Sequence, residues 1–192
     1  MVTAAMATLA VALLAAVPIG AFVRPSGGAT ECAASGYSYE GHASAGSVGR
    51  VAATIAAVAT PRVASGHVAA WVGVGDTRSH HWLQAGVAAF RGTTLRLYYE
   101  LALPGMKRRY VELDRDVALR DPHRIAVAET APGWWRVEVD GSAVTAPIFV
   151  GESWRGVATA ESWTAAHAPC NRYGFRFDRV SGAGASAFAA RA

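Results

Sequence analysis

The chain has 192 residues, of which 52% are apolar and 17% charged, and its formal net charge at pH 7 is +4. This length suits one domain, and the apolar fraction is too high for an intrinsically disordered protein. Only about the first 23 residues are apolar enough to span a bilayer, which excludes a polytopic membrane protein. Lys107 is the only lysine and the arginines are scattered, so no dense basic stripe suggests nucleic-acid binding.

The N-terminal segment, residues 1–23, is predicted to be an export signal. It carries no charged side chain, and its centre is almost entirely Ala, Leu and Val. Pro18 and Gly20 then offer a helix break and a small residue for cleavage. The stretch is also long enough to remain as an anchor helix, and in both cases the rest of the chain lies outside the cytoplasm, secreted or anchored. We expect a membrane contact only through this helix, followed by a flexible spacer over residues 24–36.

The two cysteines, Cys32 and Cys170, predict a disulfide, because an even count in an exported protein favours pairing. Such a bridge would close a long loop and stabilise the fold by about 5 kcal/mol on the chain-entropy model. No Cys-x-x-Cys or Cys-x-x-His spacing is present, and the six histidines form no His-x-His or His-x-x-x-His pair. We therefore expect no metal and no cofactor.

The body of the chain, residues 37–182, reads as one β domain followed by a C-terminal tail over residues 183–192. Short Val-, Tyr-, Trp- and Ala-rich segments are separated by Gly, Pro and Asp turns, which favours an antiparallel sandwich or barrel. The Ala-rich stretch over residues 52–59 could also suit a helix. The predicted strands are Val48–Val58, His67–Val74, His80–Phe90, Thr94–Leu103, Tyr110–Leu113, Arg124–Glu129, Trp134–Val139, Ile148–Val150, Gly156–Trp163 and Tyr173–Val180.

Two of these strands alternate apolar and polar side chains with a period of two, which assigns their faces. Leu and Val at positions 83, 87, 95, 97 and 101 point to one side, with Ala85 and Tyr99, and suit a core. The opposite side collects His80, Trp82, Gln84, Arg96, Tyr98 and Glu100. A sheet face of this composition is typical of a binding surface, although an outer face with packed aromatic residues is the alternative.

Two catalytic patterns find little support. No Gly-x-Ser-x-Gly elbow is present, so a serine hydrolase of that type is not indicated. Some sandwich glycosidases carry Glu-x-Asp-x-Glu on one strand, and Glu138-Val139-Asp140 stops short of that pattern.

A third pattern consists of three segments in order: Ala-Trp-Val-Gly-Val at residues 70–74, Trp-Leu-Gln-Ala-Gly-Val at residues 82–87, and Tyr-Tyr-Glu at residues 98–100 before Pro104. They are followed by Thr-Ala-Glu-Ser-Trp at residues 159–163. This order resembles the glutamic peptidases (eqolisins). That family has a Trp-Val-Gly-Ile-Asp-Gly strand, a Gln-Thr/Ala-Gly strand, a Trp-Tyr-Glu-Trp-Tyr-Pro strand and an Ala-Glu-Trp segment. The similarity covers roughly residues 48–180, but Asp76 is displaced by one position and Ser162 is inserted.

The resemblance implies a concanavalin A-like (jelly-roll) antiparallel sandwich of two seven-stranded sheets with an active site on the concave face. It implies Gln84 and Glu161 as the catalytic pair of an acid endopeptidase, a hydrolase acting on polypeptides. In that mechanism the glutamate activates a water, and the glutamine orients it and binds the oxyanion. The residues expected to bind substrate are Trp71, Trp82, Tyr98, Glu100 and Trp163.

The alternative is a catalytically inactive concanavalin-like module that binds a saccharide or cell-wall polymer on its aromatic face. In either case we expect a monomer that does not bind nucleic acid.

Overall fold

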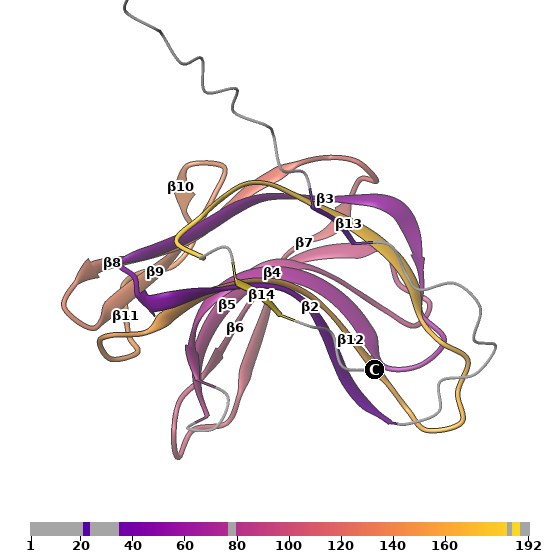
Figure 1. Cartoon of the computed structure of the whole chain (residues 1–192), viewed down its shortest axis with the longest axis horizontal. Coiled ribbons are helices and arrows are strands. Elements are labelled where there is room, and N and C mark those ends of the chain that lie inside the picture. The colour runs from indigo at the N-terminus through magenta and orange to yellow at the C-terminus, as the bar shows by residue number, and fades with distance from the viewer. Residues whose placement is uncertain (1–20, 24–34, 77–79, 184–185, 189–192) are drawn as a thin grey trace, which may run out of the picture.

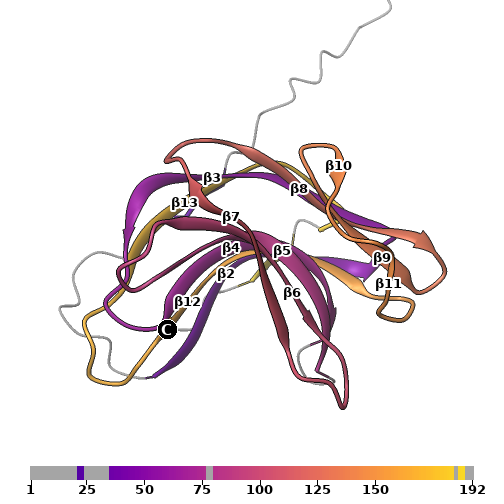
Figure 2. The ribbon, with the colours of Figure 1, turned by 180° about the vertical axis from the view of Figure 1, so that it is seen from behind.

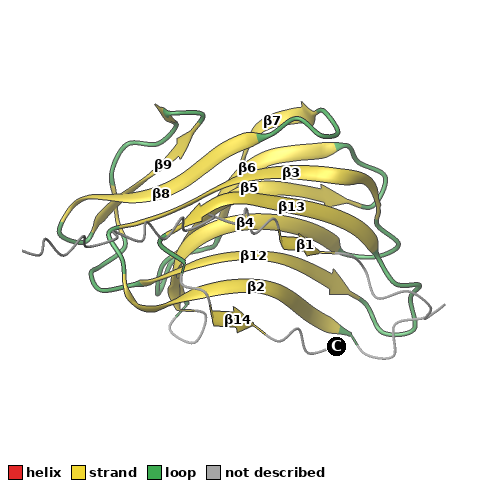
Figure 3. Ribbon diagram, turned by 45° about the horizontal axis from the view of Figure 1, so that its top comes forward, coloured by secondary structure: helices red, strands yellow, loops and turns green. Residues whose placement is uncertain are grey.

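The computed structural model describes residues 21–23, 35–76, 80–183 and 186–188. Within these ranges the chain forms strands and loops and no helix (Figure 3). The described strands make two seven-stranded sheets whose pairings are all antiparallel, packed face to face (Figure 1). The all-β, two-sheet sandwich predicted from the sequence is confirmed. The predicted N-terminal helix falls mainly on residues 1–20, outside the described residues, and the described part holds no helix able to span a membrane.

One sheet, here called the convex sheet, has the strand order β1–β13–β3–β8–β9–β10, and β11 also pairs with β9. Its first strand, Ala21–Val23, pairs with Phe175–Phe177 although it belongs to the segment assigned to the export signal. The strands of this sheet are β1 (Ala21–Val23), β3 (Arg50–Arg62), β8 (His123–Ala131), β9 (Trp134–Val139), β10 (Ser142–Ala143), β11 (Ile148–Phe149) and β13 (Arg172–Ser181).

The other sheet, here called the concave sheet, has the order β14–β2–β12–β4–β5–β6–β7. It arches so that its outer side is hollow, as the front and back views show (Figures 1 and 2). Its strands are β2 (Gly36–Ser47), β4 (His67–Asp76), β5 (His81–Phe90), β6 (Leu95–Ala102), β7 (Arg109–Val117), β12 (Arg155–Thr164) and β14 (Ser186–Phe188).

The hydrophobic core fills the space between the sheets. Val68, Val72, Leu83 and Val87 of the concave sheet are at most 1% exposed and belong to the same cluster as Trp135 of the convex sheet. The inward set predicted for β5 and β6 is confirmed, because six of these side chains are buried in that cluster and the seventh, Leu101, packs against it. The Ala-rich segment is strand β3, not helix, since its small side chains pack flat on both sides of a buried strand.

The sequence did not predict β2 or β14. In β2 the Gly-, Ser- and Tyr-rich sequence buries a single residue, Ser44, so no apolar alternation marks the strand. Its conformation comes instead from backbone pairing with β12 on one side and β14 on the other. The strand predicted from His80 begins at His81, because His80 has a positive φ of 55° and lies in the turn before it.

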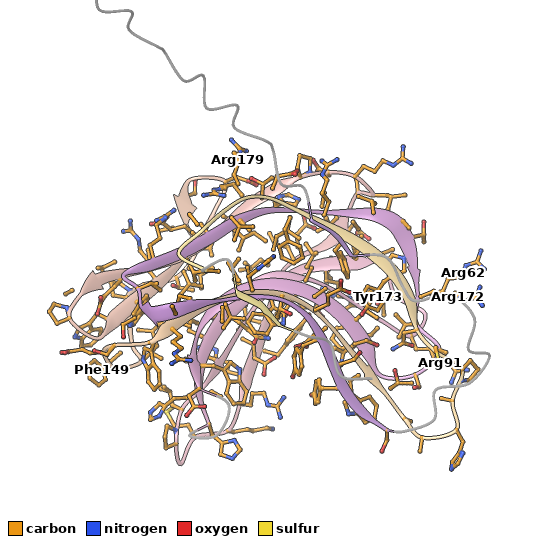
Figure 4. The ribbon with its side chains drawn as sticks, viewed as in Figure 1. Arg62, Arg91, Phe149, Arg172, Tyr173 and Arg179 are labelled. Atoms are coloured by element: carbon orange, nitrogen blue, oxygen red, sulfur yellow. The ribbon has the colours of Figure 1, made fainter. Side chains whose placement is uncertain are left out.

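The two faces outside the core differ in character. On the convex sheet Arg50, Arg136 and Glu138 form ion pairs, and Figure 4 shows Arg179 projecting away from the sandwich. Figure 4 also places Phe149 at one end of the molecule and Arg62 with Arg172 at the other. The outer face of the concave sheet carries the residues that the sequence analysis singled out.

Candidate active site

Every residue predicted to act in catalysis or substrate binding lies on one side of the concave sheet. Antiparallel partners that lie directly opposite share a face, and alternate residues along a strand do too. Glu161 lies opposite Ala69, Trp71 opposite Gly86, and Gln84 opposite Glu100. We call this side the concave face. It comprises Tyr37 and Tyr39 on β2, Thr159, Glu161 and Trp163 on β12, His67 and Trp71 on β4, Trp82 and Gln84 on β5, and Tyr98 and Glu100 on β6.

Both carboxylate oxygens of Glu161 have partners. Oε2 accepts a hydrogen bond of 2.9 Å from Nε1 of Trp71, and Oε1 lies 3.0 Å from Nε2 of His67. The residue is only 6% exposed. A buried carboxylate needs such partners because removing it from water without them is costly. The position and orientation of this carboxylate are therefore fixed by two ring systems on the neighbouring strand β4.

The carboxamide of Gln84 is also buried, at 9% exposed. Its Nε2 donates to the hydroxyl oxygen of Tyr98 at 3.2 Å. Gln84 and Glu161 lie on strands separated by β4, and their partners on β4, Gly73 and Ala69, are four residues apart. Trp71 occupies the position midway between those partners and binds the carboxylate. The structure thus brings amide and carboxylate to one face, on either side of Trp71.

The acidic and phenolic groups of this face influence one another. Burial raises the pKa of Tyr98 well above its usual value, and the charges of Glu161 and Glu100 raise it further. Burial also raises the pKa of Glu100, against the opposing effect of Arg108 and with a further rise from Glu161. The pKa of Tyr39 is raised by burial and then by Glu161. The charge of Glu161 therefore acts on Glu100, Tyr98 and Tyr39 across the face.

Arg108, just before β7, lies across part of this face. Its Nε is 3.4 Å from Oε1 of Glu100, and its guanidinium carbon lies 5.5 Å from the ring centroid of Trp82. Burial lowers the pKa of Arg108, but Glu100 and Tyr37 outweigh this effect and raise it. Because Tyr37 belongs to β2 and Glu100 to β6, the arginine links the two flanks of the arched sheet.

Aromatic rings surround the buried groups. The rings of Tyr37 and Tyr39 stack at 5.7 Å and are 45% and 37% exposed, so they offer an accessible platform on β2. The ring of Tyr98 is buried instead and stacks on Tyr110 at 4.9 Å. Trp163 is partly buried and its indole lies against Gly66. Gly66 has a positive φ of 66°, and a Cβ there would lie 2.1 Å from the indole ring.

Glycines face several of the large side chains. Gly86 lies opposite Trp71, Gly73 opposite Gln84, and Gly75 opposite Trp82. A Cβ at Gly86 would lie 2.7 Å from Cβ of Trp71 and would also meet the backbone of the neighbouring strand. The absence of side chains at these glycines gives the large partners room to lie across the neighbouring strand.

Sequence reasoning missed His67, Tyr37 and Tyr39 of the concave face, and Arg108, which lies across it. The sequence did contain a signal for His67. Alternate residues of a strand share a face, so a strand that places Trp71 on the concave face also places position 67 there. Tyr37 and Tyr39 flank Ser38, a spacing that puts both rings on one face of a strand, but the strand β2 that carries them was not predicted. Arg108 gave no signal, because it reaches the face from a loop.

Other features lie away from this face. Glu138 belongs to the outer face of the convex sheet, where hydrogen bonds from Arg50 and Arg136 outweigh the effect of burial and lower its pKa. An open depression of about 590 Å³ is lined by residues 47–49, 129–132 and 152–153, from the ends of β2 and β8 and the adjoining loops, none of which was predicted to be functional. No three His, Cys, Asp or Glu residues group as metal ligands in the described part of the chain. Cys170 precedes β13 and Cys32 lies outside the described residues, so their pairing stays a prediction.

No protein-family model and no curated protein matches the chain. Solved structures do match. Scytalido-glutamic peptidase, in complex with a transition state analog inhibitor, shows 15% identity over 77% of this chain and 82% of its own, with a TM-score of 0.53. An eqolisin-family peptidase in complex with the tripeptide Ala-Ile-His shows 18% identity over 75% and 64%, with a TM-score of 0.42. A Bacillus licheniformis beta-glucanase shows 14% identity over 69% and 67%, with a TM-score of 0.39. At 15% identity the likeness to the first of these structures supports the sandwich fold and nothing beyond it.

Proposed function

We propose that the protein is a glutamic-type peptide hydrolase that uses Glu161 and Gln84. The observation that carries this proposal is the environment of Glu161: a buried carboxylate held on both oxygens, on the same open sheet face as a buried carboxamide. The resemblance of the surrounding segments to the eqolisins supports it, as does the sandwich fold. Neither the fold nor the structural neighbours separates a peptidase from a saccharide-active protein.

In the proposed reaction Glu161 acts first as a general base. Each carboxylate oxygen has two lone pairs, so an oxygen that accepts one hydrogen bond can still take a proton from water. The water oxygen attacks the peptide carbonyl carbon, and the negative charge moves to the carbonyl oxygen. The protonated Glu161 then gives its proton to the amide nitrogen as the C–N bond breaks.

Gln84 is proposed to bind the oxyanion. Its Nε2 carries two hydrogens, and the bond to Tyr98 uses one of them. The other can donate to the developing oxyanion, an interaction worth about 3 kcal/mol in comparable sites. Tyr98 is therefore proposed to hold the amide rather than to contact substrate through its buried ring.

The remaining predicted residues divide by their contacts. Trp71 is proposed to hold Glu161, while Trp82, Glu100 and Trp163 contact an extended polypeptide along the face. The exposed tyrosines of β2, Tyr37 and Tyr39, are proposed as an additional platform for it.

The test is hydrolysis of a denatured protein and of fluorogenic peptides by the purified protein between pH 2.5 and 8. We expect Glu161→Gln to lower kcat by about 10²–10⁴-fold with its melting temperature nearly unchanged, because general acid–base catalysis contributes that much. The control is Glu152→Gln, which alters an exposed carboxylate in the loop between β11 and β12. Equal peptide hydrolysis by wild type and Glu161→Gln would falsify the proposal.

A second candidate is a module that binds saccharides or a cell-wall polymer without catalysis. The exposed, nearly parallel pair of Tyr37 and Tyr39 favours it, because sugar rings stack on such aromatic surfaces. Binding to β-glucan that Tyr39→Ala abolishes, in a protein that hydrolyses no peptide, would support this candidate and exclude the first. Hydrolysis of β-glucan that depends on Glu161 would exclude both.

We also propose, from the sequence alone, that the protein is exported and that Cys32 pairs with Cys170. A shift in mobility on reduction of the purified protein would report the disulfide.

A further inference from the structure

His67 is the basic residue in direct contact with Glu161. It begins β4, two residues before the position opposite Glu161, and its Nε2 reaches Oε1 diagonally at 3.0 Å. The histidine side chain is 22% exposed and the carboxylate side chain 8%. This contact therefore joins a partly accessible imidazole to a buried carboxylate.

The imidazole ring is held from three strands. Tyr37 of β2 meets it edge-on with ring centroids 5.8 Å apart, and Phe90 of β5 lies at 5.7 Å. Glu161 of β12 supplies the third contact. The backbone oxygen of His67 also accepts a hydrogen bond of 3.4 Å from Nδ2 of Asn171. Ring and backbone are thus both restrained, so that Nε2 stays directed at the carboxylate.

The ionisable groups around this pair are known for each neighbouring strand. They are Tyr37 and Tyr39 on β2, Glu161 on β12, Tyr98 and Glu100 on β6, Arg108 before β7, and Tyr173 on β13, on which the charge of Glu161 acts. From β5, the contact is the uncharged Phe90. Arg108 pairs with Glu100 and also interacts with Tyr37, the tyrosine that meets the imidazole edge-on, so its positive charge belongs to the surroundings of the pair.

We propose that His67 is a positioning residue for Glu161, and that the protonation of its imidazole sets the pH range in which Glu161 works. This inference rests on the proposed function. A neutral imidazole can donate its Nε2 hydrogen to the carboxylate and leave it a competent base. An imidazolium donates the same hydrogen but adds a positive charge, which favours the ionised carboxylate and weakens it as a base. Imidazole changes between these forms in the range of about pH 5 to 8.

Two variants separate the hydrogen bond from the charge. His67→Gln keeps an N–H donor and cannot ionise, whereas His67→Phe keeps a ring and loses the donor. We expect the wild-type kcat/KM profile to contain an ionisation between about pH 5 and 8 that His67→Gln lacks. We expect His67→Phe to lower kcat by about 10- to 100-fold with KM nearly unchanged, the effect of losing one hydrogen bond to a charged group.

The matched control is His123→Gln. His123 also pairs with a carboxylate, Asp140, at 2.8 Å, but it belongs to the convex sheet. This variant should keep the wild-type pH profile. A pH profile of His67→Gln that still shows the ionisation, or an unchanged kcat in His67→Phe, overturns the inference.

A readout that does not need activity separates this inference from the proposed function. The ¹³Cε1 resonance of His67 is followed against pH by NMR in wild type and in Glu161→Gln. Because a neighbouring carboxylate favours the imidazolium, the inference predicts a lower midpoint in the variant than in wild type. An unchanged midpoint overturns the coupling between His67 and Glu161, whatever the peptide assays show. A lowered midpoint in a protein that hydrolyses no peptide contradicts the proposed function and leaves the coupling standing.

Discussion

At the scale of single residues, the surroundings give the same side chain different properties. Glu138 on the convex sheet has two arginine partners, which lower its pKa despite its burial. Glu100 on the concave face has a raised pKa, because burial outweighs the opposing effect of Arg108. A carboxyl group that is harder to ionise suits a face on which protons are transferred.

The raised pKa of Glu100 predicts the sign of a stability change. The folded state holds the proton of this carboxyl more tightly than the unfolded chain does, so folding is favoured at low pH and loses this contribution as the pH rises through the folded-state pKa. Glu100→Gln should therefore raise the free energy of unfolding at pH 7 relative to wild type. Below about pH 4, where the carboxyl is protonated in both states, the two proteins should converge.

Urea denaturation at pH 7 and at pH 3.5 measures this difference. Arg108 is largely exposed and remains hydrated after the substitution, so its loss of a partner adds little. A variant that is less stable than wild type at pH 7 contradicts the cause given for the raised pKa.

Sequence reasoning worked unevenly at this scale. The alternation of residues 82–90 and 95–101 was enough to put Gln84 and Glu100 on one face, because the pleat fixes the direction of side chains. It could not find His67 as the partner of Glu161, since their contact is diagonal between strands 94 positions apart in the chain. Nor could it show that Tyr98 binds Gln84, because that requires the register of β5 with β6.

At the scale of strands, the concave face depends on glycine as much as on its large residues. In the pairing of β4 with β5, Trp71, Gln84 and Trp82 each lie opposite a glycine. A cross-strand pair of two large side chains would fill the space above the sheet, whereas this arrangement lets one side chain extend over its partner's strand. The glycine in the Gln-Ala-Gly segment thus has a steric role beside Trp71.

Gly86→Ala should therefore destabilise the protein by about 1–3 kcal/mol, as an added methyl group does in a packed position. It should also lower peptide hydrolysis, because Trp71 must move away from Glu161. Chemical denaturation and kcat measurements on the same preparation test both effects. Gly46→Ala in β2, where a Cβ would meet nothing within 4 Å, is the control and should change stability by no more than about 0.5 kcal/mol. Equal stability of the two variants contradicts the steric role.

Strands with an apolar alternation were predictable, and β2 was not. Its sequence buries one residue and owes its extended form to its neighbours β12 and β14. Pairing partners more than a hundred residues away are not encoded locally, so the platform of Tyr37 and Tyr39 could not be foreseen.

At the scale of the whole molecule, stability and the proposed chemistry lie on opposite sides of one sheet. The main core fills the space between the two sheets and includes Ile55, Leu83 and Phe175. A small second cluster, Ala69, Ala88 and Tyr98, lies on the concave face itself, with Trp71, Phe90 and Tyr110 packed against it. The apolar pattern that predicted the sandwich belongs to the first cluster, which is why the fold was easier to predict than the site.

This division predicts that core changes alter stability without altering chemistry. Ile125 is fully buried on the convex sheet, and Ile125→Val should cost about 1 kcal/mol and lower the melting temperature by about 2–4 °C. Hydrolysis per folded molecule, with the folded fraction taken from circular dichroism, should equal that of wild type. A fall in kcat at a temperature where the variant is fully folded would show that the two sides of the sheet are coupled.

The placement of the residues opposite glycine on β4 and β5 has a practical consequence for redesign. Randomising only the concave-face positions of these two strands and of β12, with the glycines kept, would vary the reactive layer while the positions between them keep their inward, water-excluding contacts. A library built in this way samples new specificities on an unchanged framework, and its folded yield should far exceed that of a library of equal size spread over every position of the same strands.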